Sequence, residues 1–158
     1  MQQMNSENVR KIWERVQQAN APAGEHPDLC GCTVRELNTA AIYAYLSRRI
    51  PGKEGKMLQR LAQQERSHAA TVKGICAVTY GSCPPVRITP PEKLSVPVLL
   101  RRCYGQKLQA IAEYEKLSSQ EGYGSIFRRL AQEEQEQLLF LLQLLGTLDP
   151  STPTPSHR

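Results

Sequence analysis

Two segments with helical periodicity place charged side chains where their apolar pattern reserves positions for the core. In the first segment, in the middle of the chain, the spacing of Leu, Val and Ile passes through Glu65 and His68. In the second, near the end of the chain, it passes through Glu134 and Gln137. A buried carboxylate is costly unless it is paired or binds a metal ion. Two helices that bury a carboxylate at the same depth therefore indicate a shared polar centre.

The two segments are also related in sequence. Residues 61–68 align with residues 130–137 at an offset of 69, and four of the eight aligned positions are identical. Glu65 aligns with Glu134, whereas a glutamine stands opposite His68. The repeat indicates two related helical hairpins.

The elements that must position these residues follow from proline, glycine and capping residues. Thr33, with Glu36 three positions later, forms a capping box, and Gly or Pro ends each of the segments that follow. The pattern predicts no strands and five helices, at about 6–20, 33–50, 53–80, 95–120 and 125–145.

The connections between these helices predict a topology. The second helix is joined tightly to the third, and the fourth to the fifth, so each pair should form an antiparallel hairpin. A proline-rich segment at 81–94 separates the pairs and is long enough to run along a bundle in extended form. The order short, long, short is typical of a four-helix bundle with one crossover.

These residues resemble the ferritin-like superfamily, most closely its rubrerythrin-like members. That family takes one Glu from each of two helices and a Glu-x-x-His pair from each of the other two. Here Glu36 begins the pattern, Tyr43 follows on the same face, and Glu65-x-x-His68 comes at a spacing that suits equal depth on two antiparallel helices. The resemblance covers about residues 32–146 and implies an all-α, ferritin-like four-helix up-down bundle with one long crossover, to which the sequence pattern adds an extra N-terminal helix. We therefore expect an N-terminal helix and loop at residues 1–31, the bundle at 32–146 and a disordered tail at 147–158.

The second half of the chain departs from the family pattern. Glu134 matches it, but Gln137 stands at the histidine position. Counting back from Glu134 by a similar spacing reaches positions 101–105, which hold no carboxylate, and Glu92 and Glu113 are out of register. The metal ligands that the resemblance implies are Glu36, Glu65, His68 and Glu134. Three carboxylates and one imidazole suit iron or manganese, but a coupled pair of iron ions would lack ligands.

Two functions follow from this reading. The first is a rubrerythrin-like, metal-binding oxidoreductase for peroxide or oxygen chemistry, with a degenerate centre. It would need an external electron donor, because the chain has no pair of Cys-x-x-Cys motifs. The alternative is a non-enzymatic structural or interaction bundle that has lost the metal. Its carboxylates would then be held by neighbouring polar side chains, namely Arg101, Arg102, Tyr104, Gln106, Gln137 and His68. Glu133 and Glu136 lie off the apolar stripe and are predicted to be solvated.

Composition limits the other possibilities. The 158 residues fit one domain, and the net charge of +5 is a mild excess that predicts no nucleic-acid partner. No apolar run is long enough for a membrane span, and no secretory signal is visible, so we expect a cytoplasmic protein.

The cysteines and the last helix complete the predictions. The odd count of five cysteines favours free thiols. No role is assigned to the pair at Cys30 and Cys32, and the remaining three, at 76, 83 and 103, are predicted to be small buried residues. The last helix is apolar on nearly every side from 138 to 148. The first helix or a second copy in a homodimer would cover it.

Overall fold

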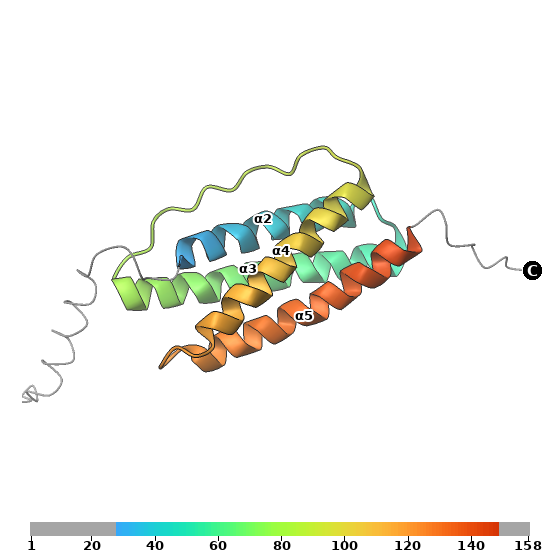
Figure 1. The fold of residues 1–158 in the computed structure, drawn as a ribbon. Coiled ribbons are helices and arrows are strands. Elements are labelled where there is room, and N and C mark those ends of the chain that lie inside the picture. Colours follow the sequence, from blue (N-terminus) through green and yellow to red (C-terminus); the bar gives the residue numbers. More distant parts are fainter. Residues whose placement is uncertain (1–27, 149–158) are drawn as a thin grey trace, which may run out of the picture.

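A computed structural model of the chain describes residues 28–148, and these residues form four helices and no strand (Figure 1). The helices are α2 (Leu29–Ser47), α3 (Gly52–Tyr80), α4 (Val96–Leu117) and α5 (Gly124–Thr147). The prediction of an all-α bundle is therefore confirmed. The predicted first helix, at 6–20, and most of the predicted tail lie outside the described residues.

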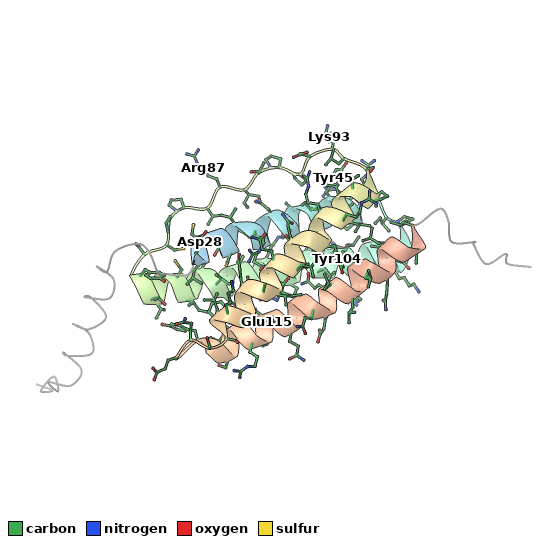
Figure 2. The ribbon with its side chains drawn as sticks, viewed as in Figure 1. Asp28, Tyr45, Arg87, Lys93, Tyr104 and Glu115 are labelled. Carbon is green, nitrogen blue, oxygen red and sulfur yellow. The ribbon has the colours of Figure 1, made fainter. Side chains whose placement is uncertain are left out.

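The connections have the predicted order. Residues 48–51 join α2 to α3, and residues 118–123 join α4 to α5, so each pair packs as a hairpin. The crossover, residues 81–95, runs in extended form along the bundle (Figure 1). Its Arg87 and Lys93 point away from the helices (Figure 2). One polar contact ties the crossover to α2, because the Thr89 N–H donates to Asn38 Oδ1 at 3.2 Å.

The first helix of the bundle begins earlier than predicted. Asp28, rather than Thr33, caps α2, and its carboxylate accepts a hydrogen bond from the Gly31 N–H at 2.8 Å. Thr33 lies inside the helix, where its hydroxyl donates to the Leu29 carbonyl at 2.9 Å. The other boundaries differ by a few positions at most: α2 ends before Ile50, α4 ends before Gln120, and α5 begins at Gly124 and ends at Thr147.

Each hairpin turn depends on a glycine at an equivalent position. A Cβ at Gly55 would lie 2.0 Å from the Ile50 carbonyl oxygen, and one at Gly124 would lie 2.2 Å from the Ser118 carbonyl oxygen. Any side chain here would push the two helices of the hairpin apart. The two glycines are separated by the same offset as the sequence repeat. The correspondence between the two hairpins therefore extends beyond the short segment that first indicated it.

The core consists of two apolar clusters with a polar layer between them. One cluster joins the start of α2 and α5 to the end of α3 and α4, and includes Val72, Tyr114 and Phe127. The other joins the opposite ends of the helices. Of the apolar band at the end of α5, Leu141 is buried, whereas Leu139 is 60% exposed. The buried polar side chains of the described residues are Thr33, Glu36, Thr39, Glu65, His68, Lys107, Glu134 and Gln137.

Candidate functional site

The four residues that the resemblance nominated as metal ligands lie together in the polar layer. Glu36 comes from α2, Glu65 and His68 from α3, and Glu134 from α5. Each offers one ligand atom, and these atoms all lie within 4.8 Å of one another. All four residues are buried, and none is more than 2% exposed. The predicted grouping is present, and its chemistry depends on what else faces it.

A lysine that sequence reasoning missed lies among these carboxylates. Lys107 on α4 is 1% exposed, and its Nζ lies 2.6 Å from Glu134 Oε2 and 3.9 Å from Glu36 Oε2. The same ammonium group donates a hydrogen bond to Glu65 Oε2. A cation belonging to the chain itself therefore contacts all three carboxyl groups.

The position of Lys107 corrects the register assumed for the second hairpin. The prediction counted back from Glu134 to positions 101–105, but the residue at the required depth is Lys107, which lies closer to Glu134 in the sequence. An offset of 71 places Lys107 opposite Glu36 and Tyr114 opposite Tyr43. Aligning the two tyrosines would have found the lysine. The prediction missed Lys107 because it required a carboxylate at this depth.

Two tyrosines and a glutamine extend the hydrogen bonding of the layer. Tyr114 OH donates to Glu36 Oε1, and Tyr43 OH donates to Gln137 Oε1 at 3.1 Å. Gln137 in turn donates from Nε2 to Glu65 Oε1 at 2.6 Å. The tyrosine of each hairpin thus bonds to a residue of the other hairpin. These bonds hold the two hairpins in register across the polar layer.

His68 is surrounded by carboxylates on both sides of its ring. Its Nδ1 lies 2.8 Å from Glu134 Oε1 and its Nε2 lies 2.6 Å from Glu133 Oε2. Burial alone would lower the pKa of His68, but hydrogen bonds to Glu134 and Glu36 outweigh burial and raise the pKa to about 10. His68 is therefore a second cation of the centre. Glu133, predicted to be solvated, is half-buried instead because it bonds to this ring.

Two cations face three fully buried carboxyl groups, and the pKa shifts of these carboxyl groups differ. Burial opposes ionisation of Glu36, but the hydrogen bond to His68 and the charge of Lys107 lower its pKa to about 2. Burial, with the charges of Glu36 and Glu134, raises the pKa of Glu65 well above its usual value in spite of Lys107. Burial would also lower the pKa of Lys107, but the three carboxylates raise it, so the ammonium form persists.

The residues do not fit a metal ion while Lys107 remains in place. Glu36 Oε2 and Glu134 Oε2 lack a hydrogen-bond partner, which is what a vacant ligand position would require. Lys107 Nζ nevertheless lies 3.9 Å and 2.6 Å from these two oxygens. Carboxylate oxygens bind metal ions at about 2.0–2.6 Å, so an ion bridging Glu65 and Glu134 would need the space that the ammonium group fills.

Most of the polar neighbours proposed for a metal-free centre do not reach it. Arg101 and Arg102 are exposed, and Arg102 pairs instead with Glu92 at 3.3 Å. Gln106 bonds to Thr39, outside the charged group. Tyr104 packs beside the apolar cluster at one end of the bundle. Of the proposed partners, only His68 and Gln137 contact the carboxylates, and the missing cation is Lys107.

The chain matches no protein-family model, no curated protein and no solved structure. Within residues 28–148, no helix is both long and apolar enough to cross a membrane. The function must therefore be argued from the charge centre itself.

Proposed function

We propose that this chain is a ferritin-like bundle in which Lys107 replaces the metal ion, and that it serves as a non-enzymatic structural or interaction protein. The observation that carries the proposal is the position of the lysine. Its ammonium group contacts Glu36, Glu65 and Glu134, the carboxyl groups that a metal ion would otherwise hold together.

The electrostatics support this proposal. A buried carboxylate cluster needs nearby positive charge, and here the charge comes from Lys107 and His68. A metal-dependent oxidoreductase needs a metal position open to its oxidant. A covalently attached ammonium group neutralises the cluster but offers no such position. The centre is therefore suited to holding two hairpins together rather than to catalysis.

The relation between the hairpins supports the ferritin-like part of the proposal. Tyr43 and Tyr114 correspond, and so do Gly55 and Gly124, so the two halves share one plan. The first hairpin keeps the family's Glu and Glu-x-x-His pattern. The second has a lysine and a glutamine at two of those three positions. Both exchanges remove a metal ligand, and the first also supplies the compensating charge.

One observation favours a second candidate, a metal-binding oxidoreductase. The ligand atoms of Glu36, Glu65, His68 and Glu134 lie within 4.8 Å of one another, which is close enough to share one ion. Iron or manganese would suit this donor set, and an external electron donor would be needed. This candidate requires Lys107 to withdraw from the carboxylates.

Metal loading of the purified chain separates the two candidates. The protein is incubated with Fe(II) without oxygen, or with Mn(II), then desalted and analysed for metal and for its melting temperature. We expect far less than one ion per chain and no change in melting temperature. One ion per chain, lost in Glu65→Gln and in His68→Gln but retained in the exposed control Glu136→Gln, would overturn the proposal and establish the metal-binding candidate.

A further inference from the structure

Four of the five free cysteines lie at the end of the bundle where α2 begins and α3 ends, and one of them, Cys32, is hydrogen-bonded to Glu113. Cys30 lies in the first turn of α2, Cys76 in the last turns of α3, and Cys83 at the start of the crossover. Cys76 is buried, whereas Cys30 and Cys83 are partly exposed. These three thiols are distant from the charge centre and have no part in the proposed function.

The end of α3 folds the crossover back over Cys76. Gly81 has a φ of 78°, in the left-handed region, and its N–H donates to the Ala77 carbonyl at 2.9 Å. The chain then turns so that the Ser82 carbonyl oxygen lies 4.0 Å from Cys76 Sγ. Cys83, the next residue, packs against the apolar cluster that contains Cys76. Burial and then the neighbouring Cys83 thiol raise the pKa of Cys76 to about 11.

We propose that Cys76 and Cys83 form a thiol-oxidation site that closes into an intrachain disulfide when the protein meets a peroxide. The turn at Gly81 folds the chain back so that Ser82 lies against Cys76 Sγ and Cys83 packs against the same apolar cluster, so closing the bond needs no rearrangement of the helices. The bond would fasten the start of the crossover to α3.

The exposure of the two thiols sets the order of the reaction. Cys83, partly exposed, attacks one oxygen of hydrogen peroxide, and the O–O bond breaks to give a sulfenic acid and one water. Cys76 then attacks the sulfenic sulfur, the S–O bond breaks, and the proton of Cys76 leaves with the hydroxyl group as a second water. Two thiols lose two electrons and two protons, and one peroxide is reduced to two waters.

The remaining thiols are poorly placed for this chemistry. Cys103 is fully buried, and Cys32 is held by a hydrogen bond to Glu113 Oε2 at 3.2 Å. Burial shields both thiols from a peroxide in solvent, so neither can begin the reaction. Cys30 is the one competitor, because it is also close enough to Cys76 to influence its pKa.

Peptide mapping after peroxide treatment tests the proposal directly. Trypsin cuts after Lys73 and Arg87, so Cys76 and Cys83 share one peptide, whereas Cys30 lies in another. The native full-length chain is treated with hydrogen peroxide at neutral pH, its free thiols are alkylated, and the digest is analysed by mass spectrometry. We expect two of the five thiols to be lost and the shared peptide to escape alkylation, with a mass two hydrogen atoms below that of its free-thiol form. Dithiothreitol should restore both.

Three variants decide the assignment. Cys83→Ser, at a partly exposed position, should retain the Cys76 thiol after treatment. Cys30→Ser and the buried control Cys103→Ser should still lose two thiols. The proposal is overturned if the shared peptide is unchanged, if Cys30 becomes linked to Cys76, if a covalent dimer forms, or if the bond appears only in denaturant.

Discussion

The two hairpins of this bundle share a backbone plan but place different charged side chains in their common interior. α2–α3 brings Glu36, Glu65 and His68, and α4–α5 brings Lys107, Glu134 and Gln137. Each has a glycine at its turn, a tyrosine two turns beyond its first polar residue, and a glutamate on its second helix. The main difference is at one position, where a carboxylate in the first hairpin is an ammonium group in the second.

That difference shows how one exchange of charge can alter what a buried centre needs. With a carboxylate in both hairpins, the layer would hold four buried acids and would depend on an external cation. With Lys107 in the second, the opposite charges are joined to the same chain, and the layer is neutralised whenever the hairpins dock. The two versions of the centre would therefore differ in metal dependence while keeping the same fold.

Removing the lysine should give the largest effect on stability. Lys107→Met leaves three buried carboxyl groups with only His68 as a cation, and breaking a buried pair in this way costs about 3–5 kcal/mol. Urea unfolding followed by circular dichroism measures the loss. The exposed Lys116→Met on the same helix is the matched control and should change stability by less than about 0.5 kcal/mol. An equally stable Lys107→Met would mean that the lysine does not neutralise the centre.

Making the second hairpin like the first should create metal dependence. In Lys107→Glu combined with Gln137→His, both hairpins carry Glu and Glu-x-x-His, so Mn(II) or Zn(II) has a full set of ligands. Metal at about 100 times its dissociation constant should stabilise this variant by about 2.7 kcal/mol, seen as a higher melting temperature. If the metal-free variant does not fold, it should still refold when metal is present.

A control at exposed positions of the same helices makes that result specific. Lys116→Glu with Gln135→His introduces the same residue types on the surface. It should show no stabilisation by metal. If the interior variant behaves like this control, the equivalence drawn between the two hairpins is wrong.

The two aligned glutamates should respond differently to loss of charge. Glu134 contacts both cations, at 2.6 Å from Lys107 and 2.8 Å from His68. Glu134→Gln should therefore lower the free energy of unfolding by about 1.5–3 kcal/mol. Glu65→Gln should leave stability unchanged or raise it, because burial beside two carboxylates already raises the pKa of Glu65 and favours its neutral form. Denaturant unfolding at neutral pH compares them. Equal losses would show that the layer distributes its charge evenly.

The pH dependence should show the smallest effect near neutrality. The pKa of His68 rises from 6.5 to about 10 on folding, so the stability it adds is complete below pH 6.5 and is lost as the pH rises through 10. Glu36 acts in the opposite range: its pKa falls from 4.5 to about 2, so its contribution is present above pH 4.5 and is lost as the pH falls through 2. His68→Gln, which copies the residue of the second hairpin, should flatten the alkaline decline in melting temperature. If the melting temperature of His68→Gln declines at alkaline pH as steeply as that of the wild type, another group causes the decline.

The sequence predicted the features that depend on local spacing. Proline and glycine located the four described helices, and the interrupted apolar stripes identified Glu65 and Glu134, because periodicity and punctuation are properties of neighbouring residues. Capping was less certain, since Asp28 and Thr33 are both good capping residues and the choice depends on which backbone groups are free.

Lys107 was missed although it also lies on an apolar stripe. Position 107 is on the buried face of α4, together with Cys103, Ala110 and Tyr114. A lysine on a helix is usually solvated, so its residue type gives no sign that it is buried. Its burial depends on the carboxylates of three other helices, which are brought near it only by the tertiary fold. Glu133 was wrongly predicted to be solvated for a similar reason. It lies off the apolar stripe of its own helix, but the fold brings His68 of α3 within hydrogen-bond distance of it.

The length of the crossover has a consequence for assembly. Residues 81–95 run outside the hairpins and make one polar contact with α2, at Asn38, so the two halves of the chain are held together mainly by their shared interior. Before docking, Glu36 and Glu65 have no lysine nearby, and Lys107 has only Glu134 as an acidic partner within the layer. Two molecules that exchanged hairpins would form the same charge pairs between chains as one molecule forms within itself. The crossover thus permits a domain-swapped dimer in which each centre joins Glu36 and Glu65 of one chain to Lys107 of the other.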